Sequence, residues 1–179
     1  MVCAATLQGR IAAIGDGDSL VVTDAGGTSH RVRLAAIDAP ELGQAFGKSA
    51  QRSLSTMVLG KAVTVEYRAR DSYGRIVGKV FSAGEDINLR QIAAGMAWHY
   101  KRYQGEQASP ERRRYARAEI EARAKRLGLW RDSAPLAPWD FRHPRSGRTG
   151  SGVIRYHYCA TVLARRASNL PEAVPRSIG

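Results

Sequence analysis

Four of the acids and one of the arginines in the first quarter of the chain have residue types and spacing that could form one binding site. Carboxylate oxygens are preferred ligands of hard divalent cations, and a guanidinium group binds phosphate through two parallel hydrogen bonds. Clustering the acids would be destabilising unless a cation lay among them. The residue types therefore favour a site that binds a cation and an anionic substrate together. The acids are Asp16, Asp18, Asp38 and Glu41, and the arginine is Arg33.

Two expected strands and their turns would position these side chains. A strand over 20–23 follows the Asp-Gly turn at 16–18, and a second strand is expected over 30–37. Alternation along the second strand sends its apolar residues to the core and leaves Arg33 facing solvent. Pro40 should stop the strand, because proline cannot donate to the ladder. If the 16–18 turn folds back beside that end, the acids and the guanidinium share one pocket.

The rest of the chain switches between strand and helix patterns. Further strands are expected over 8–14, 61–70 and 75–81. Asn88 and Ser109 are the predicted caps of two helices. Five strands with a helix after the third predict an α+β, mainly β fold, a Greek-key barrel of the OB type packed by about three helices. The helices are expected over 44–59, 88–95 and 109–127.

Arginine gives the chain a strong positive charge. The sequence has 28 Lys plus Arg against 16 Asp plus Glu, for a net charge of +12. This excess favours a polyanionic partner, although a genome biased toward arginine codons would explain it without one. The two cysteines are too few for a disulfide framework, and no run is apolar enough to span a bilayer.

Four motifs, taken together, resemble the staphylococcal nuclease (thermonuclease) family. They are DGDS at 16–19, RLAAIDAPE at 33–41, DSYGR at 71–75 and the region from GMAWHYKRY to GLW at 95–130. The resemblance implies a nuclease domain over 7–130. The arginine-rich tail over 131–179 has no counterpart that we recognise, and either strengthens nucleic-acid binding or is disordered.

The resemblance also implies a calcium site. The ligands would be the side chains of Asp18 and Asp38 and the backbone carbonyl of Ala39, with Asp16 near the metal but not bound to it. The family often has threonine where this chain has Ala39. Because the ligand there is a main-chain oxygen, alanine should keep the site.

Two arginines and a glutamate have roles implied by the same resemblance. Glu41 would activate the attacking water, and Arg33 and Arg75 would hold the scissile phosphate. Tyr73 and Tyr103 would line the nucleotide pocket. Structural explanations remain open, since strand arginines often serve as surface ion-pair partners and aromatic residues often cover a core.

The expected function is calcium-dependent hydrolysis of DNA and RNA by a thermonuclease-like endonuclease, with little sequence preference and with 3′-phosphate products. One alternative is a nucleic-acid-binding module that kept the barrel and lost the chemistry, and another is a structural or partner-binding domain whose charge is incidental. The retained acids and arginines favour the enzyme. A monomer is expected. The resemblance favours secretion or a periplasmic location, but no signal peptide is visible, so a cytoplasmic location stays open.

Overall fold

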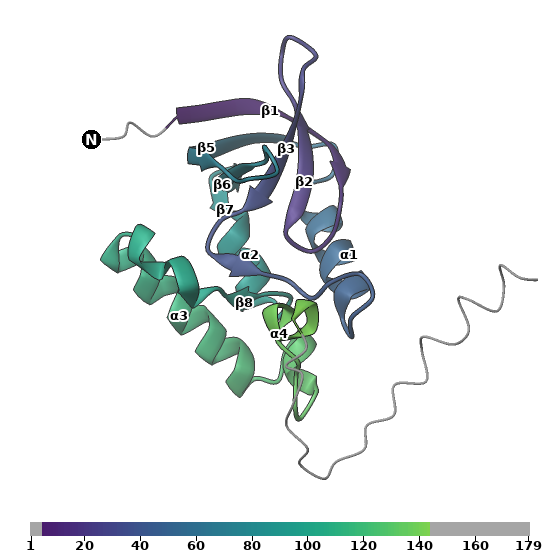
Figure 1. The fold of residues 1–179 in the computed structure, drawn as a ribbon, viewed down its shortest axis with the longest axis vertical. Helices are drawn as coiled ribbons and strands as arrows, with labels where there is room; N and C mark the ends of the chain where they lie inside the picture. The colour runs from purple at the N-terminus through teal and green to yellow at the C-terminus, as the bar shows by residue number, and fades with distance from the viewer. Residues whose placement is uncertain (1–4, 144–179) are drawn as a thin grey trace, which may run out of the picture. The chain divides into compact units, whose positions relative to one another are not determined.

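Five strands close into a barrel in the computed structural model, which describes residues 5–143 (Figure 1). Strand β1 pairs antiparallel with β2 and β5, β2 pairs with β3, and β5 pairs with β6. A parallel pairing of β3 with β6, in which Val32 lies opposite Ile76, closes the ring. The predicted OB-type barrel is therefore confirmed. The barrel strands are β1 (Ala5–Ile14), β2 (Ser19–Thr23), β3 (Ser29–Leu34), β5 (Ala62–Arg70) and β6 (Ile76–Ser82).

Helix α1 buries one face in the barrel core. Its buried residues Ala50, Leu54 and Val58 recur every four positions, which is the apolar stripe that the sequence predicted. Helix α2 packs against β6 and α3. Within residues 5–143, no helix is long and apolar enough to cross a bilayer. The helices are α1 (Gly47–Val58), α2 (Ile87–Ala93), α3 (Ser109–Ala124) and α4 (Pro138–Arg142), the 3-10 turns are η1 (Lys101–Glu106) and η2 (Gly128–Arg131), and the short strands are β4 (Ile37–Asp38), β7 (Glu85–Asp86) and β8 (Trp98–His99).

Strand β3 is shorter than predicted. It ends at Leu34, because Ala36 adopts a left-handed conformation with a φ of 62° that turns the chain out of the ladder. The chain then forms β4, which pairs with β8 and places Asp38 opposite Trp98. Asp38 therefore lies in a separate two-stranded sheet and not in the barrel wall.

Two predicted helix caps are wrong. Asp86 caps α2, because its side chain accepts a hydrogen bond from the N–H of Leu89. Asn88 lies inside the helix and is fully buried, with its side chain hydrogen-bonded to β6 and to the turn after β3. Ser109 is the first residue of α3, and no side chain caps that helix. Asn88 therefore ties α2 to the turn that leads into β4.

Packing continues past Trp130. The Gln44 side chain donates a hydrogen bond to the carbonyl of Leu136, and Pro138 begins α4. Both contribute to the same compact unit as the barrel. The remainder of the predicted tail, from residue 144, including the 153–164 segment with strand or helix character, lies outside the described residues.

Candidate active site

Asp18 and Asp38 meet at one guanidinium group. Asp18 ends the turn between β1 and β2, Asp38 lies in β4, and both are buried. Nη1 of Arg33 lies 2.8 Å from Oδ2 of Asp18, and Nη2 lies 2.9 Å from Oδ1 of Asp38. Oδ2 of Asp18 also accepts the N–H of Ala39 at 2.8 Å. The Arg33 side chain is 17% exposed and lies among the acids. The prediction that it faces solvent is therefore wrong.

The turn before β2 is shaped by its own first acid and by a glycine. Oδ1 of Asp16 accepts the N–H of Asp18 at 3.0 Å. The carbonyl of Gly17 accepts a hydrogen bond from Gln91 at 2.7 Å, and a Cβ at Gly17 would lie 2.6 Å from the methyl group of Ala39. This close approach needs glycine. Asp16 therefore orients the turn, and its predicted place beside a metal stays a prediction.

The cluster favours added positive charge. Burial raises the pKa of Asp18 to about 7, Arg33 opposes that rise, and the neighbouring carboxylates of Asp16 and Asp38 add to it. Burial alone would lower the pKa of Arg33, but Asp18 and Asp38 hold it above its usual value. Arg33 therefore stays charged while the carboxylates around it exceed its single charge.

A second arginine, which the sequence did not predict, reaches the same acids. Nη2 of Arg142 lies 2.6 Å from Oδ2 of Asp38, and Nη1 lies 2.6 Å from Oε1 of Glu41 and 3.2 Å from Oδ1 of Asp38. Hydrogen bonds to Asp38 raise the pKa of Arg142, burial opposes this, and Glu41 adds to the rise. Glu41 therefore joins the cluster through Arg142. The sequence signal that pointed to a helix carrying Arg142 was Pro138, which favours a helix start and lies beyond the predicted domain boundary.

The residues fit a hard divalent cation in their chemistry. Within residues 5–143, no set of three or more His, Cys, Asp and Glu side chains is arranged as a ready metal cage. The proposed donors are two carboxylates, from Asp18 and Asp38, and the carbonyl of Ala39, all of them oxygens of the kind that calcium prefers. The guanidinium of Arg142 forms ion pairs with both Asp38 and Glu41. The acids are thus close enough to share one cationic partner.

Arg75 and Tyr73 lie in the turn between β5 and β6. Nε of Arg75 lies 2.8 Å from Oδ2 of Asp71, and its guanidinium lies 5.4 Å from the centre of the Tyr73 ring. In the described part of the chain, Arg75 forms no ion pair with the clustered acids. Tyr73 is 72% exposed. The structure therefore holds this pair together without joining it to the cluster, and the predicted roles of both residues stay predictions.

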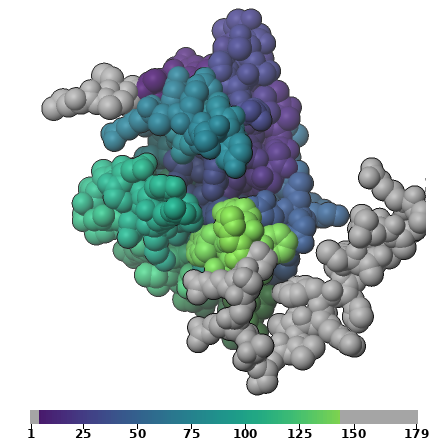
Figure 2. Space-filling view, in the orientation of Figure 1, coloured from purple at the N-terminus to yellow at the C-terminus, as the bar shows by residue number. Residues whose placement is uncertain are grey.

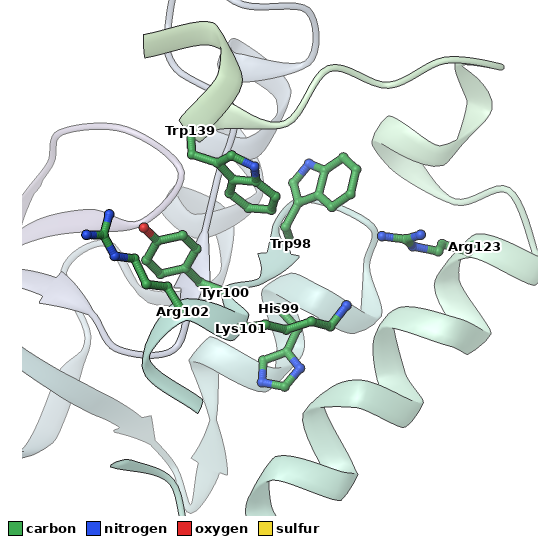
Figure 3. A pocket seen from close by; sticks show the side chains of 7 residues that line it. All are labelled: Trp98, His99, Tyr100, Lys101, Arg102, Arg123 and Trp139. Carbon is green, nitrogen blue, oxygen red and sulfur yellow. The ribbon is translucent and has the colours of Figure 1, made fainter. Parts of the chain in front are cut away.

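An aromatic pocket lies beside β8 and α4, with a volume of about 350 Å³ (Figure 3). Trp139 lies 5.4 Å from Trp98 and 5.5 Å from Tyr100 between ring centres. Tyr103 lies outside this pocket, 5.7 Å from the ring of Tyr100, and borders a second hollow beside β6. The alternation of aromatic and basic residues near 98–103 was the sequence signal for this surface. The lining residues are Trp98, His99, Tyr100, Lys101, Arg102, Arg123 and Trp139.

Comparison with known proteins identifies the family. A family model described as "Staphylococcal nuclease homologue" matches residues 31–132. An "uncharacterized endonuclease" of Escherichia coli is 38% identical over 143 residues, which cover 79% of this chain and 89% of that protein. A "micrococcal nuclease" of Shigella flexneri is 38% identical over 154 residues, covering 81% of this chain and 86% of the relative. Another "uncharacterized endonuclease", from Haemophilus influenzae, is 39% identical over 133 residues, 74% of this chain and 71% of its own length. With its closed barrel and its acids gathered around Arg33, the chain belongs to the staphylococcal nuclease family.

Proposed function

We propose that this protein is a calcium-dependent nuclease that hydrolyses DNA and RNA with little sequence preference and leaves 3′-phosphate ends. The observation that carries the proposal is the meeting of Asp18, Asp38 and Arg33 in one buried cluster with Glu41 at its edge. Such a cluster combines oxygen donors for a hard cation with a guanidinium for phosphate.

Glu41 is the proposed base. Its side chain is 34% exposed, whereas Asp38 beside it is buried, so Glu41 is the acid of this pair that water can reach. It takes a proton from the water whose oxygen bonds to phosphorus. The bond from phosphorus to the 5′ oxygen breaks, the 5′ oxygen takes up a proton from solvent and leaves as a hydroxyl group, and the phosphate stays on the 3′ side. Proton transfer of this kind contributes about 10²- to 10⁴-fold in rate.

The arginines stabilise the negative charge that gathers on the phosphate oxygens. The Arg33 guanidinium lies between Asp18 and Asp38, so it would bring positive charge to a phosphate bound beside these acids. Arg75 supplies a second guanidinium from the turn after β5. A bound calcium ion held by Asp18, Asp38 and the carbonyl of Ala39 would add positive charge beside the phosphate.

The aromatic pocket supports nucleotide binding. Trp98, Tyr100 and Trp139 offer ring faces on which bases stack, and each such stack contributes about 1–3 kcal/mol without sequence preference. Arg123, whose guanidinium lies 4.8 Å from the Trp98 ring centre, adds positive charge to the same wall. Tyr103 extends this surface beside Tyr100. Stacking and phosphate attraction together suit a substrate of either sugar type.

The test is cleavage of plasmid, single-stranded DNA and RNA with calcium, magnesium or chelator. We expect cleavage with calcium, loss with chelator, and a fall of about 10²- to 10⁴-fold in Glu41→Ala. Glu106→Ala, which removes an exposed acid from η1, is the matched control and should cleave at the wild-type rate. Ordinary cleavage by a folded Glu41→Ala protein would reject the role of Glu41. Tight binding of nucleic acid without cleavage under every condition would instead establish the non-catalytic binding module.

A further inference from the structure

Arg142 neutralises the acids that the proposed cation would use. Both oxygens of Asp38 lie against guanidinium nitrogens, with Oδ1 shared between Arg33 and Arg142 and Oδ2 contacting Arg142 at 2.6 Å. The same guanidinium reaches Glu41 at 2.6 Å. Arg33 alone would leave the carboxylates with excess negative charge. Arg142 supplies a second positive charge in a bidentate geometry, which is the strongest form of such a contact.

Helix α4 is held in place by contacts other than those of Arg142. Trp139 packs against Trp98 and Tyr100, and the carbonyl of Leu136 accepts a hydrogen bond from Gln44. In Figure 2, the α4 segment, drawn in lime green, lies at the surface of the domain. The Arg142 side chain can therefore swing away from the acids while the rest of α4 stays seated.

A cation that binds Asp38 would compete with the Arg142 guanidinium for the same carboxylate oxygens. Placing a divalent cation beside Arg142 would bring like charges into contact, which is unfavourable. Arg33 is the less mobile of the two arginines, because it contacts Asp18 as well and is 17% exposed. Arg142 is 36% exposed and ends a short helix. Cation binding should therefore displace Arg142 and leave Arg33 in place.

We propose that Arg142 is an internal counter-charge that occupies the carboxylates in the absence of metal and must be displaced before a divalent cation binds Asp38. This inference rests on the proposed function, since it concerns the same calcium site. It adds a means of setting metal affinity, because the strength of the contacts between Arg142 and the acids opposes binding. The measured calcium affinity is then weaker than the intrinsic one by the fraction of molecules in which Arg142 is already released.

Calcium titration by calorimetry, without nucleic acid, tests this competition. Arg142→Gln should bind calcium at least about tenfold more tightly than the wild type, because the competing charge is gone. Arg142→Lys should fall between them, since an ammonium group cannot bridge two carboxylates as a guanidinium does. Arg113→Gln, which removes the same charge from an exposed site on α3, should leave calcium affinity unchanged.

The outcomes separate this inference from the proposed function. Equal or weaker calcium binding by a folded Arg142→Gln protein would overturn the counter-charge role while leaving the calcium site intact. That result together with weakened DNA binding would show Arg142 to be a phosphate ligand instead. Failure of the wild type and of all variants to bind calcium would overturn both the inference and the proposed metal site. Thermal melting of each variant checks that its fold is retained, and Arg142→Lys provides the comparison if Arg142→Gln is unstable.

Discussion

Gly47 has no side chain, which lets the backbone of Glu41 lie close to the start of α1. A Cβ at this position would lie 1.8 Å from the carbonyl oxygen of Glu41, 2.6 Å from its carbonyl carbon and 3.0 Å from Cα of Leu42. All three are backbone atoms, so no side chain can rotate to make room. Gly47→Ala must therefore move the segment that carries the proposed base.

The size of the effect follows from these distances. Ordinary van der Waals contact begins at 3.4 Å, so the Glu41 carbonyl has to shift by well over 1 Å. A displacement of about 1 Å at a catalytic group costs about 10²-fold in rate. Overpacking also strains the fold, typically by about 1–3 kcal/mol. We expect Gly47→Ala to cleave DNA about 100-fold more slowly and to unfold at a lower temperature.

Gly43→Ala is the matched control. Gly43 belongs to the same loop, has nothing within 4 Å of the position that a Cβ would occupy, and is absent from the glycines with positive φ. It should cleave DNA at the wild-type rate. Plasmid cleavage and circular dichroism are measured on both variants at a temperature where both are folded. A folded Gly47→Ala protein with wild-type rate, or equal losses in both variants, would refute the reasoning.

The remaining predictions concern the buried core and Arg75. Asn88→Ala should lower the free energy of unfolding in urea by at least about 1–3 kcal/mol, because it leaves the buried N–H of Val80 unpaired; a smaller loss would contradict that contact. The Tyr115 hydroxyl donates a hydrogen bond to Asp86 at 2.9 Å. Burial, and after it the charge of Asp86, raises the pKa of Tyr115. The stability that Tyr115 contributes is therefore complete below about pH 10 and is lost as pH rises further. Tyr115→Phe should therefore be less stable than wild type at about pH 8 by about 1–3 kcal/mol, with a gap that narrows by about pH 11 in urea unfolding; a constant gap would count against it. Arg75→Ala should slow cleavage by at least about 10²-fold, and unchanged kcat and KM would remove Arg75 from the mechanism.

The barrel was predictable because its strands carry local patterns. Val32 and Leu34 alternate with polar neighbours in β3, and both are buried as the alternation requires. The end of β3 was not predictable in the same way, because alanine rarely adopts the left-handed conformation of Ala36 and nothing in its side chain signals it. The cap of α2 was missed for a related reason. Asp86 and Asn88 are both good capping residues, and the tertiary hydrogen bonds of Asn88 decide between them.

Part of the site could be predicted because short motifs and turns carry it. The Asp-Gly turn before β2 and the proline after β4 supported only a conditional prediction, that Asp18 and Asp38 share a pocket if the turn folds back, and the structure joins the two acids through Arg33. Arg142 could not be predicted in that way. It lies 104 residues from Asp38 in sequence, on a five-residue helix too short for any periodic pattern.

The buried acids also explain why a second positive charge is needed here. Asp38 is fully buried and Asp18 nearly so, and charges in such surroundings are unfavourable unless they are paired. Arg33 satisfies one oxygen of each, which leaves Oδ2 of Asp38 to another partner. In this structure that partner is Arg142, and in the proposed reaction it is a cation. Stability alone would favour apolar residues in place of this buried cluster. The cluster is therefore best explained by a function that requires its carboxylate oxygens.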